Sequence, residues 1–559
     1  MKGAAMIIAA LEHEQVEVIF GYPGGAVLPL YDALYHAQIK HILTRHEQAA
    51  VHAADGYARV KGKPGVVFAT SGPGATNLVT GIATAYMDSV PLVIITGQVA
   101  TKLIGTDSFQ EADITGITLP ITKHNYLVGS IEELPVTLAE AFYIASTGRC
   151  GPVLIDIPKD VMEQEGTFCY ERNREIPGYR PTYVGHPGQI NRMVKAIKEA
   201  RRPVIFAGGG VIRSGAAAEL RELAIKCRIP VTLSLMSLGA FPGDNPLFLG
   251  MPGMHGMVAA NFALTEADLI IALGARFDDR VTGKLEQFAS EAKIIHVDID
   301  PAEIGKNVPI DIPIVGDVKQ VIRELLKRVQ PGDTSDWLQR IEEWQARYPL
   351  SEGTAPSSGK LKPQFVIREI NRLTGGKALI TTDVGQHQMW VAQHYCFREP
   401  RTFLTSGGLG TMGYGFPAAI GAKLASPAST VICITGDGSF QMNIQELATV
   451  VCGNYDLKVV VLNNGCLGMV RQWQELFFEK RYSQSLLHGN PDFARVAEAF
   501  GATGLRVSTA DEATAALEKA LSVRGPVVID CLIDPAENVY PMVAPNRPIN
   551  EIITGRDLE

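Results

Sequence analysis

Short apolar runs alternate along the whole chain with longer segments that have a helical hydrophobic period. Each run is rich in β-branched residues and is bounded by glycine or proline. This pattern is typical of strands buried on both faces of a parallel sheet. Because helix-length segments separate the runs, the chain is predicted to be α/β, with doubly wound parallel sheets. The clearest runs lie at residues 65–70, 91–95, 203–207, 269–273, 431–434 and 459–462.

Two polar, proline-bearing stretches interrupt this pattern. The first covers residues 165–188 and the second covers about 330–363. We interpret both as linkers, because neither has a clear hydrophobic period. We expect the tail after about Val543 to be mobile or to form part of a lid. The division predicts three doubly wound domains, an N-terminal one at 1–165, a central one at 188–330 and a C-terminal one at 360–545.

Three predicted strands are each followed by a glycine-bearing turn and then a helix, one in each block. The turns lie at 71–77, 208–210 and 436–439. In open α/β sheets ligands bind beside the carboxyl ends of the strands, where helix N-termini favour anions. A single turn of this kind is weak evidence, since many are purely structural. Three of them together favour a protein that binds phosphate-bearing ligands.

The composition excludes several classes of partner. The net charge is −8 and no basic run is present, which argues against nucleic-acid binding. No apolar stretch approaches the ~20 residues of a membrane span, and the N-terminal segment lacks a signal-type cleavage site. The eight cysteines are scattered without a Cys-x-x-Cys pair, so we interpret them as buried, reduced thiols. We expect a cytoplasmic protein with no membrane or nucleic-acid partner.

The C-terminal block contains the strongest chemical signal. Asp437 follows one predicted strand directly, and Asn464 follows the next, with a predicted helix at 441–451 between them. If the two strands are neighbours, both side chains lie at the same edge of the sheet. A carboxylate, an amide oxygen and a backbone carbonyl are hard oxygen ligands that suit Mg²⁺. The alternative is that Asp437 is a turn residue and that Asn464 belongs to an unrelated loop. Either residue taken alone would be interpreted in this way.

The sequence Gly436-Asp437-Gly438, followed by Asn463-Asn464, resembles the fingerprint of thiamine-diphosphate enzymes. The resemblance implies that Asp437, Asn464 and the backbone oxygen of Cys466 bind Mg²⁺, which in turn holds the diphosphate. It also implies a glutamate that activates the aminopyrimidine ring by sharing a proton with it. The candidate is Glu47, which opens a predicted helix after the strand at 41–43. The alternative is a carboxylate that merely interacts with the helix dipole.

Longer motifs narrow the resemblance to one family. The stretches 20–26, 70–77, 97–99, 105–111 and 407–415 resemble the catalytic subunit of acetohydroxyacid synthase (acetolactate synthase), in its biosynthetic, FAD-containing form. The resemblance implies that Met412 props the cofactor into its bent shape and that Gly410 offers a carbonyl to its amino group. Plain core packing is the alternative for Met412. The remaining residues implied at the thiamine site are Gly24, Gln110, Val384, Gly385, Gln386, His387, Gly438 and Ser439.

The central block resembles the FAD domain of the same family, in which the flavin is structural. Glycines 208–210 form a turn for close approach to a pyrophosphate, and Asp298 follows a predicted strand at 294–297. The residues that the resemblance assigns to FAD are Arg180, Gly208, Gly209, Gly210, Thr232, Leu233, Met254, His255, Gly274, Arg276, Asp298, Ile299, Asp317 and Val318.

The resemblance also implies the substrates, pyruvate and 2-ketobutyrate. One pyruvate is decarboxylated, and its two-carbon unit joins a second pyruvate or 2-ketobutyrate in branched-chain amino-acid biosynthesis. Trp473 is assigned to the alkyl group of the second keto acid and Arg280 to its carboxylate. Phe109 and Lys159 are placed near the active-site channel. A packing aromatic and a surface ion pair are the alternatives for Trp473 and Arg280.

Family members share the thiamine site between two chains and usually bind a separate small regulatory subunit. The resemblance therefore implies a homodimer or homotetramer with such a partner. Three rival functions are considered from the sequence, and the intact Glu47, Asp437 and Asn464 argue against one of them, a non-catalytic scaffold homologue. Glyoxylate carboligase also contains flavin but has an apolar residue in place of the glutamate, so Glu47 argues against it. A flavin oxidoreductase similar to pyruvate oxidase would pass electrons to FAD.

Overall fold

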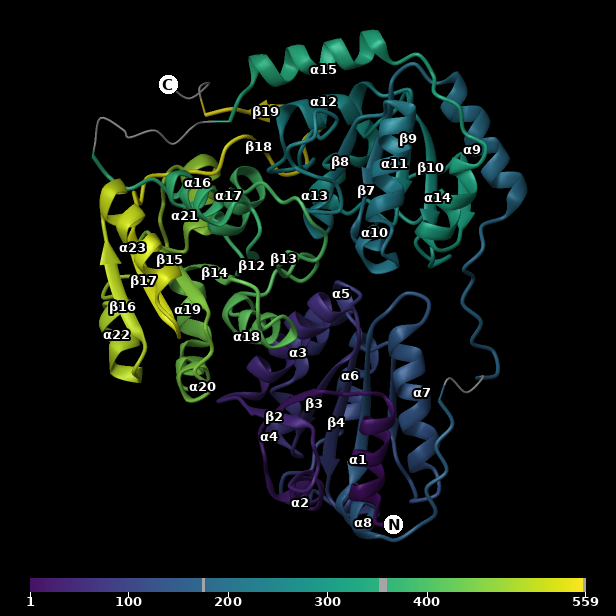
Figure 1. The fold of residues 1–559 in the computed structure, drawn as a ribbon, viewed down its shortest axis with the longest axis vertical. Helices are drawn as coiled ribbons and strands as arrows, with labels where there is room; N and C mark the ends of the chain where they lie inside the picture. The colour runs from purple at the N-terminus through teal and green to yellow at the C-terminus, as the bar shows by residue number, and fades with distance from the viewer. Residues whose placement is uncertain (173–175, 351–358, 556–559) are drawn as a thin grey trace.

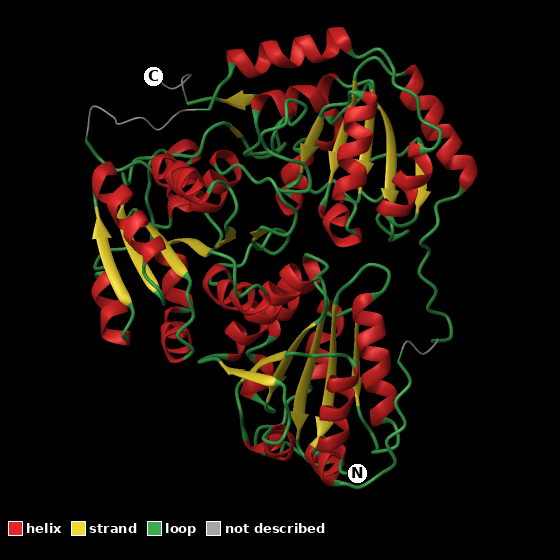
Figure 2. Ribbon diagram, in the orientation of Figure 1, coloured by secondary structure: helices red, strands yellow, loops and turns green. Residues whose placement is uncertain are grey.

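The structure is a computed structural model that describes residues 1–172, 176–350 and 359–555. It contains three parallel sheets, each flanked by helices (Figures 1 and 2). The predicted α/β class with three doubly wound parallel-sheet domains is confirmed. No helix within these ranges combines the length and apolar character that a bilayer crossing requires.

The N-terminal sheet has six parallel strands in the order β2-β1-β3-β4-β6-β5. Apolar side chains pack against both of its faces in two separate clusters, which explains why its four inner strands are largely apolar, whereas the edge strands β2 and β5 are partly polar and exposed. The strands are Lys40–Leu43 (β2), Val18–Gly21 (β1), Gly65–Ala69 (β3), Leu92–Gln98 (β4), Pro152–Pro158 (β6) and His124–Leu127 (β5). The main helices are Gly3–His13 (α1), Leu28–Leu34 (α2), Glu47–Lys61 (α3), Val79–Met87 (α5), Leu134–Ser146 (α7) and Lys159–Glu163 (α8).

The central sheet has five parallel strands in the order β11-β10-β9-β7-β8. Its strands are Ile312–Val315 (β11), Lys293–Asp298 (β10), Leu269–Leu273 (β9), Pro203–Ala207 (β7) and Val231–Leu233 (β8). Its helices include Pro187–Glu199 (α9), Gly209–Ser214 (α10), Ala217–Cys227 (α11), Val258–Glu266 (α12), Asp279–Thr282 (α13) and Val318–Leu326 (α14).

The C-terminal sheet has six parallel strands in the order β13-β12-β14-β15-β17-β16. One apolar cluster runs without a break from the central sheet into this one. The strands are Phe403–Leu404 (β13), Leu379–Thr382 (β12), Val431–Gly436 (β14), Lys458–Asn463 (β15), Val527–Leu532 (β17) and Thr503–Val507 (β16). The main helices are Pro363–Thr374 (α16), Gln386–His394 (α17), Gly415–Ala425 (α18), Asp437–Met442 (α19), Leu447–Cys452 (α20), Gly468–Phe477 (α21), Phe493–Phe500 (α22) and Ala510–Ser522 (α23).

The second predicted linker is not structureless, because it contains helix α15, Ser335–Arg347. The helix lies along α12 of the central domain (Figure 1). Trp337 and Ile341 are buried on its inner side, and their spacing of four residues is the helical signal that the polar composition obscured. Residues 351–358 of this predicted linker, and 173–175 of the first, lie outside the described residues.

One other prediction of local structure needs correction. The helix predicted at 441–451 begins earlier, at Asp437, and is broken at Asn443, whose buried amide donates to the carbonyl of Gly413 at 2.6 Å. The expectation that the tail after about Val543 is mobile or part of a lid stays a prediction. The two short strands β18 (Met542–Val543) and β19 (Ile552–Ile553) pair in an antiparallel ribbon, and Ile549 is buried against the central domain.

The cysteine prediction was only partly right. All eight thiols are free, and four of them are buried: Cys227, Cys433, Cys466 and Cys531. Cys169 and Cys452 are exposed, because they lie in a connecting segment and at a helix end, where no second layer covers them.

Candidate active site

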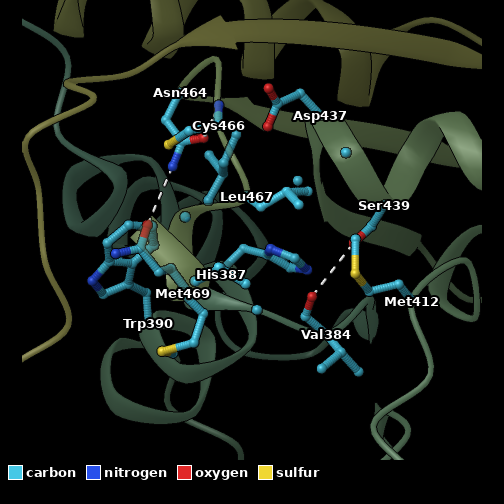
Figure 3. A pocket seen from close by; sticks show the side chains of 17 residues that line it. Val384, His387, Trp390, Met412, Asp437, Ser439, Asn464, Cys466, Leu467 and Met469 are labelled. Carbon is cyan, nitrogen blue, oxygen red and sulfur yellow. Dashed lines mark hydrogen bonds between the residues drawn. The ribbon is translucent and has the colours of Figure 1, made fainter. Parts of the chain in front are cut away.

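Asp437 and Asn464 follow neighbouring strands, as predicted. Strands β14 and β15 pair in parallel, with Gly436 in register with Leu462. Both strands therefore end at the same edge of the C-terminal sheet, and the residues that follow them line one pocket (Figure 3). Figure 3 shows Asp437, Asn464 and Cys466 together on one side of this pocket and Met412 on the other.

Three helices begin at the pocket. The first residues of α17, α19 and α21 are Gln386, Asp437 and Gly468, and all three line it. The first N–H groups of a helix have no partner within the helix, so three converging N-termini make a site for a strongly anionic group. The pocket is lined by Val384, Gly385, Gln386, His387, Trp390, Met412, Gly436, Asp437, Gly438, Ser439, Leu462, Asn464, Cys466, Leu467, Gly468, Met469 and Val470.

The oxygen donors of the pocket have defined orientations. Asn490 donates its amide N–H to Oδ2 of Asp437 at 2.5 Å, and the amide of Asn464 donates to Oε1 of Gln386 at 3.2 Å. Burial raises the pKa of Asp437 to about 6, because a surrounding of low dielectric constant disfavours the charged carboxylate. Within the described residues, no group of three or more His, Cys, Asp or Glu side chains is placed to hold a metal ion. A donor set of one carboxylate, one amide and carbonyls fits Mg²⁺ with phosphate oxygens rather than zinc.

Two glycines of this pocket are packed closely against its other side chains. A Cβ on Gly436 would lie 3.0 Å from the His387 ring, and a Cβ on Gly438 would lie 2.8 Å from Leu467. The ring of His387 is buried, its Nε2 has no hydrogen-bond partner, and burial lowers its pKa to about 3. A neutral imidazole with one free nitrogen therefore faces the space that a diphosphate would fill. The residues present fit thiamine diphosphate with Mg²⁺.

Several pocket residues were missed from the sequence. Trp390 lies one helical turn after His387 in α17, and the α21 residues Met469 and Val470 follow the first residue of that helix. Their short distance in sequence from the helix N-termini could have been used to predict that they line the pocket. Asn490 had no such signal, because it lies in a loop far along the chain and reaches Asp437 only through the tertiary fold.

Glu47 lies at the edge of the N-terminal domain. It is the first residue of α3, it is buried, and its Oε2 accepts a hydrogen bond from the amide of Asn77 at 3.0 Å. The hydrogen bond from Asn77 fixes the position of the Glu47 carboxylate, which therefore does more than interact with the helix dipole. However, within the described ranges the pocket of this chain includes no residue of the N-terminal domain. The structure does not bring Glu47 into the pocket of its own chain.

Other predicted residues gather near Glu47 at the same sheet edge. Gly24 lies so close to Thr70 that a Cβ would be 2.5 Å from the threonine methyl group. Gln110 adopts a left-handed backbone with φ +60° and lies against Gly72. Phe109 is 89% exposed, so it is free to line a shared channel. Lys159 begins α8 directly after β6, at the same carboxyl edge of the sheet, because Pro158 lies in register with Gln98 at the end of β4.

Nearly all of the residues predicted to bind FAD lie at or near the carboxyl ends of the central strands. Gly208 follows β7, Gly274 follows β9 and Asp317 follows β11. A Cβ on Gly210 would be 2.7 Å from Cα of Gly274, so this turn requires glycine. Burial raises the pKa of Asp298 to about 6. Thr232 and Leu233 lie in β8, whereas Arg276, Ile299 and Val318 follow strands β9, β10 and β11, respectively. Met254 and His255 lie in the loop before α12. Arg180 is exposed in the first linker.

The two residues predicted to bind the second substrate lie together although they belong to different domains. Arg280, in α13, extends over the ring of Trp473, in α21, with Cζ 5.9 Å from the ring centroid. Nη1 of Arg280 also lies 3.6 Å from the sulfur of Met254. Arg280 is mostly exposed, so its guanidinium is accessible to a carboxylate.

Comparison with known families supports this arrangement. Residues 1–117 match the N-terminal TPP (thiamine pyrophosphate, or thiamine diphosphate) binding domain of thiamine pyrophosphate enzymes. Residues 190–325 match the central domain of these enzymes, and residues 383–531 match their C-terminal TPP binding domain.

Similar proteins extend over the full length of the chain. The acetolactate synthase large subunit of Haemophilus influenzae is 50% identical over 569 aligned residues, which cover 100% of this chain and 99% of that protein. The acetolactate synthase of Mycobacterium bovis is 53% identical, covering 100% of this chain and 92% of the relative. The probable acetolactate synthase large subunit of Methanocaldococcus jannaschii is also 53% identical, with 99% and 95% covered. The chain therefore belongs to the acetolactate synthase large subunits, a family of thiamine pyrophosphate enzymes.

Proposed function

We propose that this protein decarboxylates pyruvate and joins the remaining two-carbon unit to a second 2-keto acid. With pyruvate as the second substrate the product is 2-acetolactate, and with 2-ketobutyrate it is 2-aceto-2-hydroxybutyrate. The observation that supports this most strongly is the pocket at the ends of β14 and β15, where three helix N-termini and Asp437 converge.

Thiamine diphosphate, when bound, supplies the electron sink that allows a 2-keto acid to lose CO₂. Asp437, Asn464 and the carbonyl of Cys466 would hold the Mg²⁺ ion. The N-termini of α17 and α19 would bind the diphosphate through residues 384–387, Gly438 and Ser439. Met412, opposite the metal ligands in Figure 3, would support the ring system of the cofactor, and Gly410 would present its carbonyl beside it.

Glu47 would act as the general acid–base of the site. Its carboxylate would hold and return a proton at Oε1 or Oε2, a role that requires direct contact with the cofactor. Because the pocket of one chain includes no described residue of the N-terminal domain, the contact would come from a second chain. Gly24 and Gln110 lie at the same sheet edge as Glu47 and would accompany it. This supports a homodimer, or a homotetramer built from such dimers.

Arg280 and Trp473 would select the second substrate. The guanidinium of Arg280 would pair with the carboxylate of the keto acid, and the indole of Trp473 would contact its alkyl group. One methylene is worth only ~1–3 kcal/mol in such a pocket, so we expect a modest preference for 2-ketobutyrate over pyruvate. Phe109 and Lys159 would line the approach to the site.

The central domain would bind FAD in a structural role. Its glycine turn at 208–210, Asp298 and Arg276 all lie at the carboxyl edge of a parallel sheet, where dinucleotides bind in such folds. Since relatives are named large subunits, we also propose a separate small regulatory subunit as a partner. We propose the limits 1–165, 188–330 and 360–545 for the three functional domains, with helix α15 packed on the central one.

The decisive experiment is to incubate the purified protein with pyruvate, Mg²⁺, thiamine diphosphate and FAD, and to assay acetolactate. We expect product only when every cofactor is present, and no product from the complete mixture would contradict the proposal. Two further arms test the rivals. Anaerobic pyruvate would bleach the flavin at the turnover rate in a pyruvate oxidase-like enzyme, and glyoxylate would be consumed by a glyoxylate carboligase. We expect neither.

A further inference from the structure

The C-terminal end of helix α5 is linked to the central domain at two points, directly through Met87 and indirectly through Arg149 of its own domain. Nη1 of Arg276 donates to the carbonyl oxygen of Met87 at 2.8 Å. Two residues later, Oγ of Ser89 accepts a hydrogen bond from Nε of Arg149 at 2.9 Å. Arg149 in turn pairs with Glu303 of the central domain at 2.6 Å. Arg276 and Glu303 follow β9 and β10, at the edge where FAD is proposed to bind.

Asp88, between these two contacts, reaches the C-terminal domain. Its carboxylate accepts the backbone N–H groups of Gly407 and Gly408 at 3.1 and 2.8 Å. Its side chain is fully buried and pairs with Arg59 at 2.9 Å. Arg59 must also neutralise Asp55, at 2.5 Å. Two buried carboxylates thus share the guanidinium of Arg59, and the glycine N–H groups satisfy acceptor positions of Asp88 that Arg59 leaves open.

The segment that Asp88 holds leads directly to Gly410 and Met412. It is confined on both sides, because a Cβ on Gly408 would lie 2.8 Å from Cβ of Met87. A Cβ on Gly407 would overlap the sulfur of Met236, in the central domain. Farther along the segment, the hydroxyl of Thr411 lies 2.6 Å from that of Thr84 in α5. The segment is therefore packed between the N-terminal and central domains.

Another side chain, Arg401, joins all three domains directly. Arg401 of the C-terminal domain donates from Nη1 to the carbonyl of Arg59 at 2.8 Å and from Nη2 to the carbonyl of Ile212 at 3.2 Å. Ile212 lies in α10, the helix that begins at the proposed pyrophosphate turn. The central domain is thus linked to the Arg59–Asp88 pair from two directions.

We propose that Asp88 is a positioning residue that couples the flavin site of the central domain to the thiamine site. Bound FAD would lie at the carboxyl edge of the central sheet, where Arg276 is located, and would thereby fix the end of α5. Asp88 would then fix Gly407 and Gly408. The position of these two glycines would in turn set that of Gly410 and Met412. The inference rests on the proposed cofactor sites, but it assigns a role to a residue outside both. Coupling of binding equilibria is reciprocal, with factors of typically ~5–150-fold. FAD is therefore expected to tighten thiamine diphosphate binding by at least ~5-fold, and thiamine diphosphate to tighten FAD binding equally.

The test is a pair of binding titrations on the full chain with Mg²⁺ present. Thiamine diphosphate is titrated by quenching of tryptophan fluorescence, since Trp390 lines the pocket, with and without saturating FAD. The ratio of the two dissociation constants is the coupling factor. We expect Asp88→Asn to reduce this factor below about twofold, because an amide presents one acceptor oxygen instead of two. The affinity for FAD alone should change little.

Asp268→Asn is the matched control. The carboxylate of Asp268 also accepts two consecutive backbone N–H groups, those of Arg201 and Arg202, at 2.8 and 2.9 Å. It lies on the surface of the central domain, away from α5, so the coupling factor should keep its wild-type value. Gly408→Ala gives a second test should Asp88→Asn fail to fold. It leaves the buried charges intact but presses a methyl group against Met87, and it should also abolish the coupling.

A coupling factor in Asp88→Asn or Gly408→Ala that equals the wild-type value overturns the inference, as does a wild-type protein that shows no coupling. These outcomes are distinct from failure of the proposed function. A wild-type protein that makes acetolactate without coupling refutes the role of Asp88 alone. One that binds both cofactors with Asp88-dependent coupling but makes no acetolactate refutes only the proposed reaction.

Discussion

The guanidinium of Arg280 lies over the indole of Trp473, with Cζ 5.9 Å from the centre of the ring. The two residues come from the central and C-terminal domains, and almost two hundred positions separate them in the chain. A cation above an aromatic face restrains both side chains. The contact therefore places a carboxylate-binding group and an apolar wall next to each other.

Replacing Trp473 is expected to change substrate preference. Trp473→Leu removes the wall that would contact the extra methyl group of 2-ketobutyrate, so the preference over pyruvate should fall by roughly 10-fold or more. The measurement is the ratio of the two products formed from a mixture of both keto acids. Trp344→Leu is the control, because Arg340 lies over Trp344 at 5.2 Å in a similar contact on α15. An unchanged product ratio in Trp473→Leu contradicts the assignment.

Replacing Glu47 is expected to impair chemistry while preserving cofactor binding. Glu47→Gln keeps the size of the side chain and can still contact Asn77, but it cannot exchange a proton. We expect the turnover rate to fall by ~10²–10⁴-fold, with the affinity for thiamine diphosphate changed by only a few-fold. Steady-state assays and fluorescence titrations measure the two quantities. Glu133→Gln, an exposed glutamate of the same domain, should behave as wild type. Full activity in Glu47→Gln would remove this residue from the mechanism.

Sharing of the site between chains predicts complementation. Glu47→Gln and Asp437→Asn homodimers should each be nearly inactive. A mixed dimer has one site with both defects and one intact site, because Glu47 and Asp437 come from different chains. Random exchange of equal amounts should therefore restore roughly a quarter of the wild-type rate. Two different affinity tags would verify that mixed dimers form. Mixed dimers without activity would show that both residues serve the site of a single chain.

Removing Asn490 is expected to weaken metal binding. Its amide holds Oδ2 of Asp437 at 2.5 Å, and groups that orient a metal ligand typically contribute 10–100-fold to affinity. We expect the Mg²⁺ concentration for half-maximal activity to rise by about that factor in Asn490→Ala. Asn191→Ala, at an exposed hydrogen bond of the central domain, is the control. Equal Mg²⁺ requirements in the two variants would rule out this orienting role.

Acidification is expected to destabilise the fold through buried histidines such as His52. Burial lowers the pKa of His52 to about 3, whereas the unfolded chain takes up the proton near 6.5. The unfolded state thus binds more protons between these values, so the free energy of unfolding decreases as the pH falls below 6.5. At pH 5 the loss from this residue is ~2 kcal/mol.

His52→Gln should therefore show a smaller decrease in melting temperature between about pH 7.5 and pH 5 than the wild type. Thermal unfolding in buffers of equal ionic strength measures this difference. His36→Gln, on an exposed surface, should follow the wild type. If the melting temperatures of His52→Gln and the wild type fall by the same amount, burial of the His52 ring does not contribute to acid sensitivity.

The sequence by itself determined the class of fold and the chemistry of the pocket. Uniformly apolar strands exist only where both faces of a sheet are covered, so the strand runs already implied parallel sheets. Asp437 and Asn464 follow neighbouring strands of such a sheet. Their position at one edge could therefore be predicted from the succession of strand, helix and strand along the chain. Helix α15 escaped prediction because the polar composition of its segment hid the spacing of Trp337 and Ile341.

Only the tertiary structure decided which residues from distant segments meet. Asn490 contacts Asp437, Arg280 contacts Trp473, and Asp88 holds Gly407 and Gly408. None of these contacts follows from periodicity or spacing, because each depends on how separate elements or whole domains pack. Packing also determines where the ribbon of β18 and β19 lies, because Ile549 makes apolar contacts with the central domain. Local sequence specifies the elements, whereas the junctions between them are set by packing that involves the whole chain.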